Sequence, residues 1–134
     1  MTTVKLDDAR RVIGAAEKKS REIGQPMNIA VADKGGNIVA HVRMDDAWIG
    51  SIDISMKRAY TSSAFEIETK ELAKHCQSGG GEFFGVHASN NGKIIIFAGG
   101  IALTLDGKVV GAIGVSRGSG DRGHTVGAAG AAAF

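Results

Sequence analysis

The chain has 134 residues, 43% of them hydrophobic, which suits one ordinary globular core, so we expect a single domain over residues 1–134. Sixteen Lys and Arg residues against 14 Asp and Glu give a net charge of +2 without a long basic run, which argues against a nucleic-acid partner. A lone cysteine, the lack of a signal-like N-terminal run and the lack of a membrane-spanning apolar stretch predict a soluble, cytoplasmic protein with no membrane partner.

The first predicted element is a helix over residues 6–23. Its apolar residues recur at helical spacing, Asp7 and Asp8 stand in its first turn, and Gly24 follows as a stop signal. This pattern is typical of an amphipathic helix that packs one face on a core.

Two strands are predicted next, over residues 28–33 and 38–44. They flank a turn with two glycines at 34–37, so we expect an antiparallel hairpin. Period-2 alternation in the second strand predicts one face with His41 and Arg43 and an opposite face with Ile38, Ala40, Val42 and Met44.

The remaining patterns complete the predicted fold. In chain order they indicate helices over 51–65 and 69–76, a glycine-rich loop over 77–82, strands over 86–89, 94–98, 102–105 and 109–116, and a helix over 125–134. Consecutive predicted strands are joined by hairpin turns and not by crossover helices. The sequence therefore predicts an α+β fold, an antiparallel β-sheet flanked by helices.

The glycines of the run 111–118 are spaced as in nucleotide-binding loops. They lie inside an apolar predicted strand, whereas a dinucleotide site needs them in the turn between strand and helix, so such a site is not predicted. The connection 118–121 does stand between a strand and a helix. Anion binding on helix N–H groups and a plain connection are equally open there.

Four histidines raise the question of a metal site. His41, His75, His87 and His124 form no HxxxH or HxH pair, and no metal site is predicted. His124 shares a polar connection with a basic and an acidic group. The residues of this group besides His124 are Arg117, Asp121 and Arg122. A binding site and a solvated charge cluster both explain the grouping.

A second polar group lies on the helix predicted over 51–65. Asp53, Lys57 and Thr61 follow at steps of four residues and share one helical face. Asp53 and Lys57 can be interpreted as a simple ion pair on the helix surface. The floor of an anion-binding pocket is the alternative interpretation.

Taken together, these motifs resemble the small GlcG/HbpS-like family, which is also found as the C-terminal part of PduO-type cobalamin proteins. The resemblance covers essentially the whole chain and rests on Val31-Ala32-Asp33-x-x-Gly36, Arg43-Met44-Asp45, Gly50-Ser51-x-Asp53-Ile54-x-x-x-Lys57, Thr61, Phe65, Gly99-Gly100, the run from Val110 to Ser116 and the closing alanine-rich run. It implies a profilin-like antiparallel sheet flanked by helices, assembled into homo-oligomers. Its members include heme-binding proteins, proteins tied to corrinoid or glycolate metabolism, and proteins encoded among catabolic enzymes.

The chain departs from the family pattern in three places. Asp121-Arg122-Gly123-His124 stands where relatives often carry an acidic segment, Ile101 stands where they often carry proline, and the first helix has no histidine that could serve as an axial iron ligand.

Two functional hypotheses follow. The first is a protein that binds heme, another tetrapyrrole or a similar anionic organic ligand, with Arg43, Lys57 and Arg117 pairing carboxylates. Further candidate ligand-binding residues are Asp53, Thr61, Gly99, Gly100, Ser116 and Arg122. The binding hypothesis ranks ahead of an enzymatic one because the sequence shows no nucleophile–base pair. Heme is the candidate cofactor.

The alternative hypothesis is a small cofactor-independent enzyme, a hydrolase or isomerase, acting on an organic acid from aromatic-compound catabolism. In it, His124 serves as general acid and base. Arg43 and Lys57 hold a carboxylate, and N–H groups near Gly99 and Gly100 stabilise an oxyanion.

Overall fold

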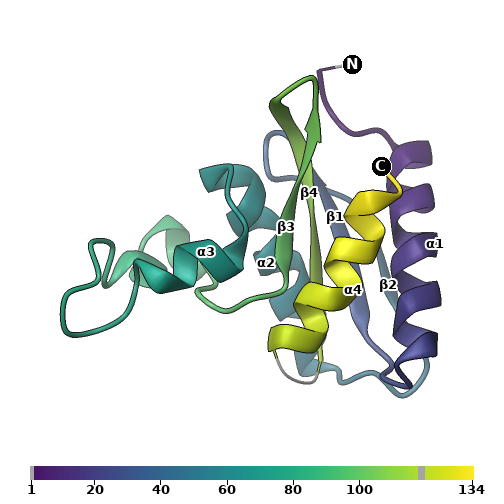
Figure 1. Cartoon of the computed structure of the whole chain (residues 1–134), viewed down its shortest axis with the longest axis horizontal. Coiled ribbons are helices and arrows are strands. Elements are labelled where there is room, and N and C mark those ends of the chain that lie inside the picture. The colour runs from purple at the N-terminus through teal and green to yellow at the C-terminus, as the bar shows by residue number, and fades with distance from the viewer. Residues whose placement is uncertain (1, 118–119) are drawn as a thin grey trace.

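A four-stranded antiparallel sheet with strand order β2-β1-β4-β3 forms the middle of the molecule (Figure 1). The structure, a computed structural model, describes residues 2–117 and 120–134. The strands are β1 (Asn28–Asp33), β2 (Ile38–Arg43), β3 (Gly100–Leu105) and β4 (Lys108–Ser116). The predicted α+β class and the predicted first hairpin are both confirmed.

Helices α1 (Leu6–Glu22) and α4 (Gly120–Ala132) lie side by side over one face of the sheet (Figure 1). Bulky aliphatic side chains fill the space between these helices and the strands. The core contains Val12, Ile13, Ile29, Val31, Ile101, Leu103, Ile113, Val115 and Val126. This face therefore supplies most of the apolar burial that drives folding.

Helix α2 (Gly50–Phe65) covers the opposite face, where the side chains are small. Its contact cluster with the sheet consists of alanines, Ala30, Ala32 and Ala59. A Cβ atom built on Gly114 would lie 2.1 Å from the carbonyl oxygen of Ser55 and 2.4 Å from the amide nitrogen of Ala59. The helix backbone thus approaches the sheet as closely as glycine permits.

The segment between α2 and β3 projects to one side of the sheet (Figure 1). It begins with α3 (Thr69–Lys74) and continues through two short 3-10 turns, Val86–Ala88 and Asn90–Gly92. The predicted strands over 86–89 and 94–98 are wrong, since neither range forms a strand. Ile94 instead packs with Leu72 and Cys76 in a small core, and Ile96 packs against the same core.

A β-bulge changes the predicted faces of β2. Ala40 lies opposite Val31 while Ile38 lies opposite Ala32, so Val39 is the extra residue. Because Val31 and Ala32 point to opposite faces, Ile38 and Ala40 do too. The prediction that Ile38 shares a face with Ala40 is therefore wrong, and Ile38 turns to the α2 side.

Helix α4 begins at Gly120, five residues before the predicted start at Thr125. Gly120 and Gly123 have low intrinsic helix propensity, so local preference alone does not favour a helix over these residues. Gly123 is close to the carbonyl of Val115 and to Gly99, and this packing overrides propensity. Residues 118 and 119 of the predicted anion-binding connection lie outside the described residues.

The N-terminal end of the chain is bonded to the sheet near the start of β4, and the C-terminal end is bonded to α1. The amide of Val4 donates to the carbonyl of Val110, and Arg11 Nε donates to the carbonyl of Ala133. No helix within residues 2–117 and 120–134 has the length and apolarity needed to cross a membrane.

Candidate functional site

Polar and aromatic groups gather at the other end of the sheet, where β1 and β3 begin and β2 and β4 end. We call this group the sheet-end cluster. It comprises Asn28, His41, Trp48, Arg58, Gly99, Ser116, Arg117, Gly123 and His124. Helix α2 begins next to this end, just after Trp48, so its N–H dipole adds positive potential there.

An indole and a guanidinium are stacked at the centre of this cluster. Arg117 Cζ lies 5.0 Å from the ring centroid of Trp48, and Trp48 remains 58% exposed. Asn28 Nδ2 donates to the Trp48 carbonyl at 2.9 Å, which ties the loop before α2 to the sheet. Arg117 has φ of +130° and a buried Nε that finds no partner in the described chain. Such strain is typical of functional sites.

Arg58 is a buried cation at the same end. It is 7% exposed, and its Nη1 donates to the Val115 carbonyl at 2.6 Å. Burial lowers the pKa of Arg58 to about 10, which leaves it charged at neutral pH. No carboxylate in the described residues pairs with it, and its Nε is also unpartnered.

Two glycines make room for this guanidinium. A Cβ on Gly99 would lie 2.9 Å from Arg58 Nη1, and one on Gly123 would lie 3.6 Å from it. The next residue, Gly100, donates its N–H to Thr69 Oγ1 at 2.8 Å in a buried hydrogen bond. The Gly100 N–H is therefore already used, and the oxyanion role predicted near Gly99 and Gly100 would fall to other donors.

Two imidazoles of the cluster have unsatisfied nitrogens. His41 is half-buried, its Nε2 has no partner within the described chain, and burial lowers its pKa, so it is neutral at pH 7. It shares a face of β2 with Arg43, as predicted from the alternation. His124 lies on α4 with a buried, equally unpartnered Nδ1. Its predicted acid–base role stays a prediction.

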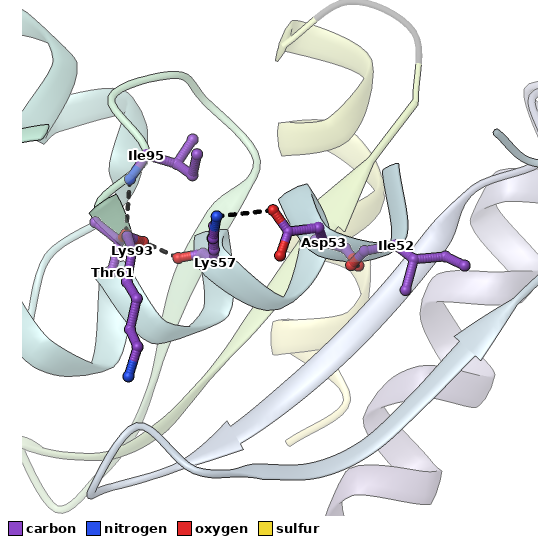
Figure 2. A network of polar contacts seen from close by, with 7 residues as sticks. Ile52, Asp53, Lys57, Thr61, Lys93 and Ile95 are labelled. Atoms are coloured by element: carbon purple, nitrogen blue, oxygen red, sulfur yellow. Dashed lines mark hydrogen bonds and ion pairs between the residues drawn. The ribbon is translucent and has the colours of Figure 1, made fainter. Parts of the chain in front are cut away.

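A separate pocket lies beside α2, lined by Gly36, Ile38, Asp53, Met56, Lys57, Tyr60 and Lys93, with a volume of about 230 Å³. We call it the α2 pocket. Lys57 Nζ lies 2.8 Å from Asp53 Oδ2 (Figure 2), so the predicted ion pair exists. Thr61 does not line the pocket. It is fully buried and donates to the Lys57 carbonyl.

The structure divides the predicted ligand-binding residues among several places. Lys57 and Asp53 line the α2 pocket, and Arg117, Ser116 and Gly99 belong to the sheet-end cluster. Arg43 ends β2 at the same end of the sheet, and it lines a third hollow with Glu17 and Arg21 of α1. Arg122 donates to Gln25 Oε1 at 2.7 Å.

Sequence reasoning missed Trp48 and Arg58. A usable signal for Arg58 was present in α2, where small serines recur at helical spacing on both sides of it. The buried stripe contains Ser51, Ser55, Arg58 and Ser62. A search for apolar periodicity does not detect such a stripe, because its members are polar.

Within residues 2–117 and 120–134, no group of three or more His, Cys, Asp or Glu side chains is arranged to hold a metal ion. A ligand in the sheet-end cluster would therefore meet guanidinium groups, an indole and single imidazoles.

Comparison with known proteins places the chain in a family. A family model described as "Haem degrading protein HbpS-like" matches residues 4–132. The chain belongs to the HbpS-like family. This confirms the predicted GlcG/HbpS-like resemblance.

Three similar proteins illustrate the HbpS-like family. An uncharacterized 15.0 kDa protein from the dhaT-dhaS intergenic region of Citrobacter freundii is 40% identical over 119 residues, covering 89% of this chain and 83% of that protein. The crystal structure of Klebsiella pneumoniae ORFY superposes with a TM-score of 0.95 at 32% identity, covering 100% of this chain and 92% of ORFY. A PduOC:heme complex superposes with a TM-score of 0.92 at 28% identity, covering 98% and 95%.

Proposed function

We propose that the chain binds an anionic tetrapyrrole, with heme as the first ligand to test, on the surface of the sheet-end cluster. The observation that carries this proposal is the neutral imidazole of His41, whose buried Nε2 has no partner in the described residues and would ligate iron once the ring turns toward the surface. A neutral imidazole nitrogen is a common axial ligand of heme iron. The cluster thus offers the donor that the first helix lacks.

Cationic groups at the same end of the sheet suit the propionates of such a ligand. Arg43 follows His41 on the same strand face, and Arg117 lies over Trp48. Guanidinium groups pair carboxylates through two parallel hydrogen bonds, which fixes orientation as well as affinity.

Exposed apolar surface suits the macrocycle itself. Trp48 is 58% exposed and the adjacent Ile49 is 75% exposed, directly before α2. Contiguous exposed apolar residues are typical of binding surfaces. By contrast, the α2 pocket holds about 230 Å³, below the range of roughly 300–1,000 Å³ for drug-sized ligands. The open sheet end is therefore the better place for a large planar ring.

The similar proteins support the same ligand class. The family is described by haem degradation, and PduOC was solved with heme. When bound, heme would supply an iron centre, while His41 would hold it, Arg43 and Arg117 would orient the propionates, and Trp48 would cover one side of the ring.

A hemin titration followed by the Soret band tests this proposal, with iron-free protoporphyrin IX as a matched second ligand. His41→Ala should weaken hemin about tenfold or more and leave protoporphyrin IX unchanged, because only hemin carries an iron that His41 would ligate. Arg117→Ala should weaken both ligands, because both carry propionates. His87→Ala on the exposed projecting segment is the control. Hemin affinity that is unchanged in both His41→Ala and Arg117→Ala would contradict the site.

We also propose that the protein is cytoplasmic and forms a homo-oligomer. Support for assembly comes from three exposed aromatic side chains on the projecting segment, Phe83 (46%), Phe84 (63%) and Phe97 (63%). The glycines of α4 do not supply it, because Gly130 packs internally against Ile113. Sedimentation should show a closed symmetric oligomer, and a monomer at micromolar concentration would contradict assembly.

A further inference from the structure

The α2 pocket has an apolar wall that is held in place by contacts on two sides. A Cβ on Gly36 would lie 2.7 Å from Tyr60 Cδ2, so the hairpin turn rests directly on the aromatic ring. The Tyr60 hydroxyl donates to Asn90 Oδ1 at 2.9 Å. Ile38, turned to this side by the bulge in β2, and Met56 of α2 complete the apolar lining.

Two ammonium groups face the same pocket. Lys57 Nζ pairs with Asp53 Oδ2 at 2.8 Å, and Lys93 Nζ lies 5.2 Å from the centroid of the Tyr60 ring. Lys93 pairs with no carboxylate in the described chain. With two lysines and one aspartate, the pocket lining carries a net charge of +1.

Thr61 connects the backbone of Lys57 to the backbone of Lys93 (Figure 2). Its hydroxyl donates to the Lys57 carbonyl at 2.8 Å, lies 3.3 Å from the Lys93 carbonyl, and accepts the N–H of Ile95 at 3.0 Å. This fully buried side chain ties irregular backbone to α2 at the position where Lys93 faces the pocket. Thr61 is thus a positioning residue for the cationic rim.

We infer that the α2 pocket is a second binding site, which takes a small organic monocarboxylate with a compact apolar body. The carboxylate pairs with Lys57 and Lys93, and the apolar body lies on Tyr60, Met56 and Ile38. The volume of about 230 Å³ suits a single ring or a short chain. This inference is independent of tetrapyrrole binding, because no residue of the sheet-end cluster lines the pocket.

Benzoate and its neutral isostere benzamide test the inference, with binding followed by NMR amide shifts of the wild-type protein. Benzoate should shift the amides of Gly36, Lys57 and Lys93 in a saturable way, and benzamide should bind at least about threefold more weakly, because it lacks the charge. Equal affinity for the two probes, or shifts confined to other parts of the chain, would overturn the inference.

Substitutions separate a binding role from a purely structural ion pair. Lys57→Met and Lys93→Met should each weaken benzoate about threefold to tenfold, as expected for a partly exposed charged contact. Asp53→Asn should strengthen it, because it removes a competing carboxylate and frees Lys57. Lys74→Met is the matched control, since Lys74 pairs with Glu71 at 2.8 Å on α3, away from the pocket. Unchanged affinity in both Lys57→Met and Asp53→Asn would overturn the assignment.

Thr61 has its own test. Thr61→Val removes the hydroxyl that ties Lys93 to α2, and should weaken benzoate while leaving benzamide unchanged. Thr61→Ser keeps the hydroxyl and should restore benzoate affinity. An equal loss of both probes in Thr61→Val would show a general structural role and remove Thr61 from the site.

Discussion

The two faces of the sheet pack in different ways, one through large side chains and the other through close backbone contact. Two neighbouring residues of β4 show the difference. Ile113 points into the aliphatic core under α1 and α4, whereas Gly114 lies against the backbone of α2. The first face excludes water with large side chains, and the second replaces side-chain volume with close backbone contact. As a result, polar side chains of α2 lie beside the sheet, where Arg58 reaches the sheet-end cluster and Asp53 and Lys57 line the α2 pocket.

The strongest way to break the α2 face is to add one methyl group. Gly114→Ala would place Cβ within 2.1 Å of the Ser55 carbonyl, so α2 must shift away from the sheet, and we expect a loss of about 3 kcal/mol or more in the free energy of unfolding. Urea denaturation measures this. Gly14→Ala is the control, since no atom lies within 4 Å of its Cβ on α1, and it should stabilise by about 0.5–1 kcal/mol. A Gly114→Ala protein with wild-type stability would refute the close approach.

The next effect concerns the hydrogen bond that holds the beginning of β3. Thr69→Val leaves the buried N–H of Gly100 without an acceptor, which should cost about 1–3 kcal/mol in the free energy of unfolding. Thr69→Ser retains the hydroxyl and should lose clearly less. Equal losses in the two variants would show that Thr69 acts through packing alone.

A smaller effect is expected on the aliphatic face. Ile113→Val removes one buried methylene and should cost about 0.5–1.5 kcal/mol. Ile38→Val is the matched control, because Ile38 is 42% exposed and its change should cost less. If both substitutions gave the same midpoint in urea, the contrast in burial between these positions would be wrong.

The smallest effect is a pH dependence at the edge of the α2 face. Burial holds the pKa of His41 below its ordinary value of 6.5, so the unfolded chain takes up the proton first as the pH falls. The free energy of unfolding should therefore decrease between pH 7 and about pH 5, and the decrease should be smaller in His41→Asn. Urea midpoints at both pH values measure it. An identical decrease in the two proteins would assign the titration to other groups.

Much of the fold could be predicted because local and tertiary preferences agree. The amphipathic period of α1 specifies a helix, and the paired glycines Gly35 and Gly36 specify a hairpin turn. Neither element depends on contacts with distant parts of the chain to be recognised. Ile94 is a counterexample. Its run of isoleucines has strand-like propensity, but the segment finds its hydrogen-bond partner in the side chain of Thr61 and its packing partner in Leu72. Tertiary contacts of this kind leave no periodic trace in the sequence.

The candidate site was less predictable for a related reason. Lys57 and Asp53 were found because an i,i+4 pair is a local relation. Arg58 was missed because an arginine on a polar helix normally lies in water, and its burial depends on Gly99 and Gly123, far away in the chain. Likewise, the single inserted residue of the β2 bulge, which moves Ile38 into the α2 pocket, has no signal in the alternation itself.

The position of the chain ends has a practical consequence. Val4 is bonded to Val110, six residues before Ser116 along β4, which corresponds to about 20 Å of strand. Ala133 is fastened to Arg11 near the same end. A tether, an affinity tag or a whole fused domain attached at either end would therefore leave the surface around Trp48 open. The protein can be anchored to a sensor or joined to a larger enzyme with its sheet-end cluster turned outward.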